Sequence, residues 1–147
     1  MQLIIFMGIQ GSGKSTFYKE KFMDGGYHRI NLDTFKTRKK EQHFFKTGLS
    51  NKLWLVIDNT NPTKADRERY IAPAKKAGGY EIIGYYFMTD LERAMKRNES
   101  RDRVVPKVGI YATLKKLERP SFAEGFDKLY FVKIDPDNKF IVEEWKE

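Results

Sequence analysis

Apolar residues in this chain are grouped in short continuous runs rather than at alternating positions, and longer mixed stretches separate the runs. Such a run is typical of a strand buried on both faces, and a mixed stretch that ends in glycine is typical of a helix. The pattern predicts strands over residues 3–7, 27–32, 53–57, 80–88 and 128–134, and helices over residues 14–23, 34–46, 62–77, 90–101 and 106–117.

The alternation of these strands and helices predicts the fold class. Strands too apolar to face water need cover on both sides, so we expect an α/β fold with a parallel sheet of about five strands and helices on both faces. Residues 140–145 are expected to pair with strand 128–134 after a turn at residues 135–138, and Pro73 is expected to kink or break its helix. No repeat or linker divides the 147 residues, which we interpret as one domain.

Composition excludes several classes of protein. No apolar run approaches the roughly 20 residues of a membrane span, and the N-terminal residues lack the basic region and cleavage site of a signal peptide. We therefore expect a cytoplasmic protein with no membrane partner. The absence of cysteine and the presence of only two, separated histidines (His28 and His43) argue against a disulfide scaffold and a zinc site. Any bound metal is expected to be a hard cation held by oxygen.

The formal net charge of +8 is concentrated in two stretches. Residues 36–46 carry five basic side chains against one acidic, and residues 93–119 carry nine against three. This balance favours a polyanionic partner, although solvated helix faces have the same composition. Three phenylalanines lie among the first group of charges, and we interpret them as core residues in preference to a surface that stacks on bases: Phe35, Phe44 and Phe45.

Residues 8–15 match the motif G-x-x-x-x-G-K-[ST] between the first predicted strand and the first predicted helix, which is the context that the motif requires. Its glycines allow successive N–H groups to point at a phosphate, and the helix N-terminus adds partial positive charge. Lys14 is expected to bridge the β- and γ-phosphates, and the Ser15 hydroxyl to bind Mg²⁺. The predicted ATP-binding residues are Gly8, Gly11, Ser12, Gly13, Lys14, Ser15 and Thr16.

Two carboxylates follow predicted strands. Asp58 comes directly after four apolar residues, where a Walker-B-type acid reaches the Mg²⁺ shell. Asp33 follows the second strand, at the carboxyl edge of the sheet where ligands bind in open α/β folds, and a carboxylate there can accept the proton of an attacking hydroxyl. Each has a plainer alternative as the N-cap of a following turn or helix.

Arginine recurs at every fourth position of the helix predicted over residues 90–101. Arg93, Arg97 and Arg101 therefore lie on one face, where their charges repel one another unless an anion neutralises them. In small P-loop kinases a helical lid brings such arginines to the transferring phosphate. The alternative is a solvated face paired with Glu92 and Glu99.

Starting from the phosphate-binding loop, blocks of sequence in a fixed order cover nearly the whole chain. They are residues 11–17, Asn31-Leu32-Asp33-Thr34, residues 57–62 followed by Arg69-Tyr70-Ile71, Lys96-Arg97-Asn98 through Arg101 to Val105-Pro106, and Pro120 with Glu124-Gly125-Phe126. In this order and spacing they resemble the polynucleotide 5′-hydroxyl kinases of T-even bacteriophages and of mammalian DNA repair. The first block is generic among P-loop proteins, whereas Asp58-Asn59-Thr60-Asn61 and the block from Arg97 to Arg101 are much more particular.

The resemblance implies a small P-loop kinase with a tunnel-like active site. It implies that Lys14 and Ser15 bind phosphate and Mg²⁺, that Asp33 is the general base, that Asp58 is the Walker-B-like acid, and that Arg101 is the essential lid arginine, with Arg97 a weaker match.

Two positions depart from the family pattern. The family usually has arginine just before the catalytic aspartate, where this chain has Leu32, and the phage enzyme has arginine three residues after it, where this chain has Lys36. Since arginine grips a phosphate with two parallel hydrogen bonds and lysine does not, we expect acceptor phosphate to be bound more weakly by Lys36, or by Arg38 instead. The sequence also ends where the phage enzyme continues into a phosphatase domain, so no 3′-phosphatase is expected, and we interpret residues 135–137 as a turn.

These observations predict an ATP-dependent, Mg²⁺-dependent kinase acting on the 5′-hydroxyl ends of DNA or RNA. The alternative within enzymes is a kinase of a small metabolite, nucleoside or modified base that uses the same machinery. From another class, a P-loop protein that binds nucleic acid or acts as a toxin would hold ATP without transferring phosphate to an end. The oligomeric state and the choice between DNA and RNA stay open.

Overall fold

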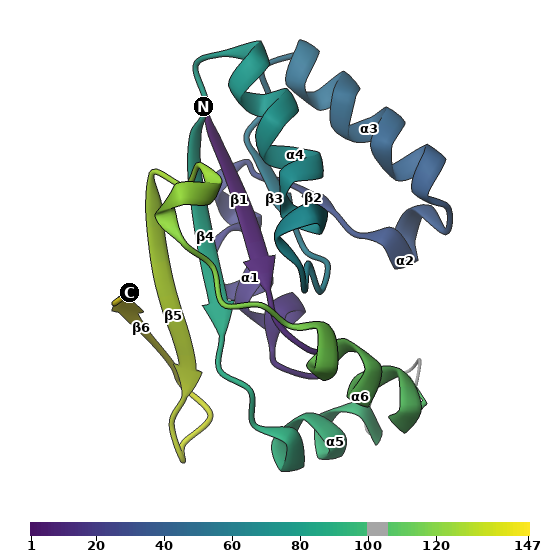
Figure 1. The fold of residues 1–147 in the computed structure, drawn as a ribbon, viewed down its shortest axis with the longest axis vertical. Coiled ribbons are helices and arrows are strands. Elements are labelled where there is room, and N and C mark those ends of the chain that lie inside the picture. Colours follow the sequence, from purple (N-terminus) through teal and green to yellow (C-terminus); the bar gives the residue numbers. More distant parts are fainter. Residues whose placement is uncertain (100–105) are drawn as a thin grey trace.

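The computed structural model describes residues 1–99 and 106–147, which form six strands, six α-helices and two 3-10 turns (Figure 1). Arg101 lies outside these described residues. The elements in chain order are β1 (Gln2–Met7), α1 (Lys14–Lys21), η1 (Met23–Gly25), β2 (His28–Ile30), α2 (Leu32–Phe35), α3 (Arg38–Ser50), β3 (Leu55–Ile57), α4 (Lys64–Ala77), β4 (Glu81–Phe87), α5 (Leu91–Glu99), α6 (Lys107–Lys116), η2 (Phe122–Glu124), β5 (Lys128–Ile134) and β6 (Phe140–Glu144).

The sheet has the strand order β2-β3-β1-β4-β5-β6. The first five strands are parallel, and β6 pairs antiparallel with β5 after the turn at residues 135–139. The α/β class, the five parallel strands and the terminal hairpin are therefore confirmed. Because the parallel strands run in one direction, their carboxyl ends meet at one edge of the sheet, which is the lower edge in Figure 1.

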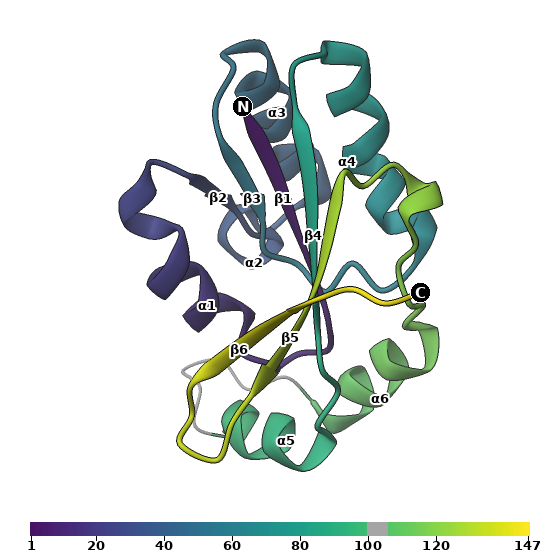
Figure 2. The same cartoon turned by 90° about the vertical axis from the view of Figure 1, so that its left-hand side faces the viewer.

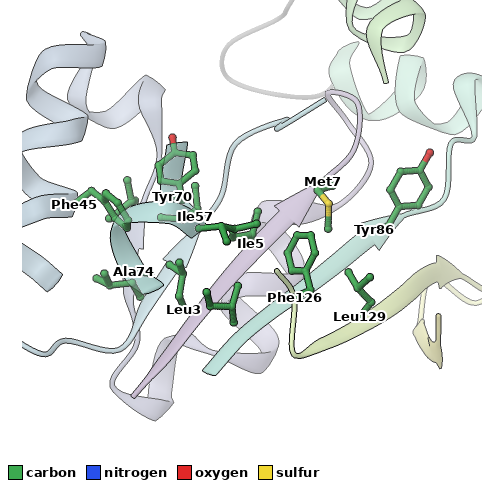
Figure 3. Close-up of a cluster of buried hydrophobic side chains, with 14 of the residues drawn as sticks. Leu3, Ile5, Met7, Phe45, Ile57, Tyr70, Ala74, Tyr86, Phe126 and Leu129 are labelled. Carbon is green, nitrogen blue, oxygen red and sulfur yellow. The ribbon is translucent and has the colours of Figure 1, made fainter. Parts of the chain in front are cut away.

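Helices cover both faces of the sheet, and every residue of β1 from Leu3 to Met7 is therefore buried. On one face, Leu3, Ile5 and Met7 pack with Phe45 of α3 and Tyr70 of α4 (Figure 3). On the other, Ile4 and Phe6 pack with aromatic residues of α1, and Figure 2 shows α1 and α4 on opposite sides of the strands. Phe45 is fully buried, and Phe35 and Phe44 pack against the same core, so the core interpretation of these three rings is confirmed.

The segment that follows edge strand β2 differs from the prediction. The strand predicted over residues 27–32 is shorter, because Asn31 leaves the sheet to cap α2 and accepts a hydrogen bond from the N–H of Thr34. The single helix predicted over residues 34–46 is two helices, because Lys36 has a left-handed backbone (φ 68°) and Thr37 caps α3. The break turns α3 so that its buried face packs on the sheet.

Pro73 does not break α4, which continues to Ala77. A proline removes one backbone hydrogen bond from a helix. Here Tyr70, Ile71 and Ala74 bury one face of the helix in the core, and Thr63 with Asp66 forms a capping box at its start. Burial and capping outweigh the local loss, so the helix does not break at Pro73.

Helices α5 and α6 lie beyond the carboxyl ends of β1 and β4 (Figure 1). They are held there by a small separate core of Ile9, Ala94 and Ile110. The loop after β1 therefore runs between the sheet and this pair of helices. Within the described residues, no helix is both long and apolar enough to span a bilayer.

Candidate active site

A cavity of about 830 Å³ opens at the carboxyl edge of the sheet. Its wall combines the loop after β1, the segments after β2 and β3, the first residue of α3, the first turns of α4, parts of α5 and α6, and the β5–β6 turn. The lining residues are Gln10, Gly11, Gly13, Lys14, Ser15, Thr16, Asn31, Leu32, Asp33, Arg38, Asp58, Asn59, Thr60, Asn61, Pro62, Asp66, Arg69, Arg97, Thr113, Lys116, Asn138 and Phe140.

The loop after β1 has a backbone that favours glycine at two positions. Gly11 and Gly13 have φ of 77° and 97°. A Cβ at Gly11 would lie 2.4 Å from the carbonyl oxygen of Ala94, and one at Gly13 would lie 2.7 Å from Nη1 of Arg97. Helix α1 starts at this loop without a side-chain cap at Gly13, and a helix N-terminus favours an anion. The loop is thus shaped as a phosphate cradle.

Lys14 lies inside this loop and is 8% exposed. Its Nζ donates to the carbonyl oxygens of Gly8 (3.0 Å) and Ile9 (2.7 Å) and to Oγ of Ser12 (3.3 Å). Gly8 and Ser12, which accept two of these hydrogen bonds, are not among the described residues that line the cavity, whereas Thr16 lines it. The ammonium group is therefore held at the floor of the cradle, within the cavity wall.

Ser15 and Asp58 form the oxygen pair that the sequence predicts for a metal. The Ser15 hydroxyl donates to Oδ2 of Asp58 at 3.1 Å, and both residues line the cavity. Two hard oxygen donors side by side suit Mg²⁺, which takes one or two protein ligands together with substrate phosphates. Within residues 1–99 and 106–147, no cluster of three or more His, Cys, Asp or Glu forms a metal cage. These residues thus supply only part of a coordination shell.

Sequence reasoning missed Arg29, which contacts both members of this pair. Its Nε donates to Oδ2 of Asp58 at 2.7 Å and its Nη2 donates to Oγ of Ser15 at 3.0 Å. The structure does not support the alternative that Asp58 serves as an N-cap, because its carboxylate accepts hydrogen bonds from the guanidinium of Arg29 and the hydroxyl of Ser15. The sequence did carry one signal for Arg29, which is a basic residue inside the second predicted strand. In the structure its neighbour Ile30 accepts the N–H of Asp58, and this pairing brings Arg29 close to Asp58.

Asp33 lies in the first turn of α2, is exposed, and lines the same cavity as Lys14 and Asp58. The N-cap of that helix is Asn31, so the alternative of Asp33 as the cap is wrong. Asn59 fixes the backbone beside Asp33, because its Oδ1 accepts the N–H of Leu32 at 2.8 Å. The ends of β2 and β3 are therefore tied together, with one carboxylate from each at the same edge.

A buried carboxylate, Glu41, organises the wall beside Asp33, and no sequence pattern pointed to it. Its side chain is fully buried, and Oε2 accepts hydrogen bonds from Tyr70 (2.5 Å), Asn59 (2.8 Å) and Arg38 (3.1 Å). Burial, followed by the hydrogen bond to Glu41, raises the pKa of the Tyr70 hydroxyl, which therefore stays a donor. Glu41 is the one acid in the basic stretch of residues 36–46.

The predicted acceptor-binding residues separate in space. Arg38 lines the cavity, and its Nη1 also donates to the Tyr70 hydroxyl at 2.9 Å. Lys36 is exposed and is not among the described lining residues, because it forms the left-handed turn between α2 and α3. Arg69 of α4, which the sequence singled out only through its block, is half-buried and lines the cavity.

The arginines of α5 also have different surroundings. Arg97 lines the cavity above Gly13, and burial, followed by the charge of Arg93, lowers its pKa. Arg93 does not face the cavity with it: its guanidinium donates to the carbonyl oxygens of Ile134 (3.1 Å) and Asp135 (3.2 Å) and holds the β5–β6 turn. In the described residues Arg93 thus serves the fold, the expectation that an anion neutralises the arginines of this face stays a prediction, and Arg101 lies outside the described residues.

Comparison with known proteins agrees with this architecture. The chain is 33% identical over 155 residues to a putative bifunctional polynucleotide phosphatase/kinase of Acanthamoeba polyphaga mimivirus, covering 99% of this chain and 36% of that protein. It is 27% identical over 132 residues to a bifunctional polynucleotide phosphatase/kinase of Schizosaccharomyces pombe, covering 85% of this chain and 32% of the relative. The chain thus spans about a third of the length of these curated relatives, and the prediction about a 3′-phosphatase stays a prediction.

The fold also matches solved structures. Chaetomium thermophilum Kti12, solved with ADP-AlF3, superimposes with a TM-score of 0.72 at 16% identity over 92% of each chain, which shows a shared fold. The resemblance to polynucleotide kinases predicted from the sequence is confirmed by the curated relatives. A family model described as an AAA domain matches residues 3–120, and the chain, with its phosphate-binding loop and kinase-like sheet, belongs to that family of P-loop nucleotide-binding domains.

Proposed function

We propose that residues 1–147 form one kinase domain that transfers the γ-phosphate of ATP to the 5′-hydroxyl end of DNA or RNA. One observation carries the proposal. The phosphate cradle of Lys14 and Ser15 and the carboxylate of Asp33 line a single cavity, although they follow different strands of the sheet, β1 and β2. A nucleotide bound at one end and a hydroxyl at the other would meet inside it.

At the nucleotide end, bound Mg²⁺·ATP would supply the phosphoryl group and neutralise its developing charge. The residues that would hold it are Ser15 and Asp58 for the metal and the backbone of the loop for the phosphates. Lys14, bonded to loop carbonyls in this structure, is the donor that would turn to the β- and γ-phosphates. Gly8 and Ser12 keep the loop in shape, and Thr16 adds a hydroxyl at the start of α1.

At the acceptor end, Asp33 would accept the proton of the attacking hydroxyl. Asn59 and Asn31 fix the backbone on which it sits, through bonds that join the ends of β2 and β3. Arg38 and Arg69 present guanidinium groups on the cavity wall, where they would bind the phosphate that follows the terminal nucleoside. Lys36, exposed just outside the cavity, would meet a more distant phosphate of the same strand.

The transferring group carries negative charge that cations must stabilise. Arg97 lies on the cavity wall directly above Gly13, so its guanidinium would reach the γ-phosphate side of the cradle. Arg101, four residues further along the chain, is assigned the lid role by its match to the family motif. Arginine is suited to this task because it stays charged and binds two oxygens at once.

A polynucleotide is favoured over a small acceptor by two observations. The first is that the curated relatives are named polynucleotide phosphatase/kinases. The second is that Arg38 and Arg69 line the cavity of a protein whose formal net charge is +8. A small metabolite would need few of these charges. A polynucleotide would use them along its backbone, which makes its binding sensitive to salt.

The proposal is tested with labelled ATP and a panel of acceptors: 5′-hydroxyl DNA and RNA oligonucleotides, matched 5′-phosphorylated oligonucleotides, nucleosides and small alcohols. We expect label on 5′-hydroxyl oligonucleotides alone. Acceptor affinity is expected to fall steeply between about 50 and 200 mM salt, by roughly threefold for each phosphate that the protein neutralises. Label only on a small molecule, with a flat salt response, would establish the small-acceptor alternative, and ATP binding without any labelled acceptor would establish the non-transferring one.

A further inference from the structure

The guanidinium of Arg29 contacts the same two oxygens that are expected to bind the metal. It donates to Oδ2 of Asp58 at 2.7 Å and to Oγ of Ser15 at 3.0 Å, while Ser15 itself donates to Asp58 at 3.1 Å. These three side chains come from β2, the end of β3 and α1, so the contact is made by the fold rather than by neighbours in sequence. Arg29 reaches the pair from β2 and is not among the described residues that line the cavity.

Asp58 needs a positive partner because its side chain is only 2% exposed. A buried carboxylate that loses both water and its counter-ion is strongly disfavoured. Arg29 supplies that counter-ion, and its own side chain remains 30% exposed beside the ring of Tyr18. The carboxylate of Asp58 is therefore neutralised by the protein's own charge, without a metal.

The same contact acts against a divalent cation. A metal at Ser15 and Asp58 would lie close to the guanidinium charge, and like charges at such separations repel strongly where water is scarce. Arg29 also occupies lone pairs on both oxygens. Nucleotide phosphates, which bring several negative charges, would offset this repulsion, whereas the protein alone would not.

We propose that Arg29 is the resident counter-cation of Asp58, and that it keeps divalent metal out of the nucleotide-free site so that metal enters together with the nucleotide. The inference rests on the nucleotide half of the proposed function and is independent of the acceptor. It assigns Arg29 a positioning role: the side chain acts on the metal through Asp58 and Ser15 and does not touch the reacting atoms.

The test is Mn²⁺ binding to the full chain, followed by the spin signal of free Mn²⁺, without nucleotide and with saturating ADP. Arg29→Gln removes the charge and keeps an amide that can donate to Asp58. Without nucleotide, we expect the variant to bind Mn²⁺ about tenfold more tightly than the wild type, a typical size for coupling between two ligands of one site. With ADP the difference is expected to shrink, because the phosphates already offset the charge.

Thermal unfolding gives a second readout that does not depend on turnover. Metal-free Arg29→Gln is expected to melt below the wild type, because Asp58 loses its counter-ion, and Mn²⁺ is expected to raise its Tm more than that of the wild type. A merely structural role for Arg29 would lower the Tm equally with and without Mn²⁺ and would leave the metal affinity unchanged. That result would overturn the inference.

Arg38→Gln is the matched control, since it also removes a guanidinium paired with a buried carboxylate at the cavity but without contact to Asp58. It is expected to leave Mn²⁺ affinity within about twofold of the wild type, and an equal gain in this variant would overturn the specific role of Arg29. If Arg29→Gln does not fold, Arg29→Met, which also removes the charge and keeps an unbranched side chain, is expected to bind Mn²⁺ about tenfold more tightly than the wild type; wild-type affinity in that variant would overturn the inference.

The failures of the two proposals are distinguishable. If ADP binds to every variant while the Arg29 variants have the same Mn²⁺ affinity as the wild type, only the role of Arg29 is overturned. If ADP binds to none of them, including the wild type, the nucleotide site itself is overturned and the inference with it.

Discussion

The two ends of the cavity are built in different ways. At the nucleotide end, a single continuous loop between β1 and α1 provides the cradle, mainly through its backbone. At the end where we propose that the acceptor binds, side chains from α3, α4 and the segment after β3 are brought together by the buried carboxylate of Glu41. The first end is local in sequence, and the second exists only after folding.

This difference predicts how each end responds to change. A backbone site fails when the loop cannot adopt its shape or when its charged side chain is lost. A side-chain site fails when the supporting network is removed, even by a substitution that touches no substrate. Substitutions at the two ends should therefore separate ATP binding from acceptor binding.

The largest effect is expected at Lys14, the side chain that the cradle places at its floor. Lys14→Ala should lower kcat by at least about a thousandfold, because a preorganised cation at the transferring phosphate is lost. Steady-state kinetics with a 5′-hydroxyl oligonucleotide check this. Lys19→Ala, on the exposed face of the same helix, is the control and should retain wild-type turnover. Turnover of Lys14→Ala within about tenfold of the wild type would remove this lysine from the mechanism.

Gly13→Ala tests whether the cradle depends on its backbone. The added Cβ would meet Arg97 at 2.7 Å, and the residue must keep φ near 97°. Distortion that costs two or three phosphate hydrogen bonds, at about 1 kcal/mol each, should weaken ADP binding roughly 30- to 150-fold.

Gly26→Ala is the matched control for that experiment, because Gly26 has a similar φ of 80° and no atom within 4 Å of the added Cβ. Both variants should lose about 1–2 kcal/mol of unfolding free energy through backbone strain. Only Gly13→Ala should lose ADP affinity, as measured by calorimetry. Equal affinities in the two variants would contradict the close fit between the loop and α5.

Glu41→Gln addresses the acceptor end. Arg38 loses its ion pair and Asn59 and Tyr70 lose a charged acceptor, so the wall beside Asp33 loosens. We expect the acceptor KM to rise about tenfold, from a charge-assisted bond worth about 1.5 kcal/mol, while the KM for ATP stays unchanged. Glu81→Gln, which breaks the exposed pair with Lys128, is the control. Equal changes in both KM values would break the division of the cavity into two ends.

The smallest effect is a pH dependence of stability at Tyr70. Burial and Glu41 raise the pKa of this hydroxyl above the ordinary 10.0, so the folded chain keeps a proton that the unfolded chain releases. Its contribution is fully present below about pH 10 and is lost as the pH rises further. Urea unfolding of Tyr70→Phe should show a shallower loss of stability above about pH 10 than the wild type, with exposed Tyr111→Phe as the control. Parallel curves would contradict the buried hydrogen bond.

The contrast also explains what the sequence could predict. The cradle, α1 and the parallel strands follow from local patterns: glycines at fixed spacing, a buried apolar run and a carboxylate at the end of a strand. The residues of the phosphate-binding loop are neighbours in sequence, so a local motif was enough to find them. Most of them line the cavity, whereas Gly8 and Ser12 are not among the described lining residues. Their chemical roles remain the subject of the predictions above.

The acceptor end was not predictable in the same way. Glu41 resembled an isolated acid in a basic stretch, and only the packing of α3 against α4 and β3 shows why it is buried. The contacts of Arg29 with Ser15 and Asp58, and of Arg93 with Ile134 and Asp135, were likewise not predictable, because these partners lie between 14 and 42 positions away in the sequence. The turn at Lys36 was missed because a left-handed lysine carries no sequence signal, and Pro73 was overruled by burial of the rest of α4.

The central claim, that the phosphate cradle and Asp33 act across one cavity, is tested most directly by Asp33→Asn. This change preserves shape and removes the proton acceptor. The account predicts that transfer to a 5′-hydroxyl oligonucleotide falls by about 100- to 10,000-fold while the Kd for ATP, measured by calorimetry on the same preparation, stays within about twofold of the wild type. Undiminished turnover in this variant would contradict the account.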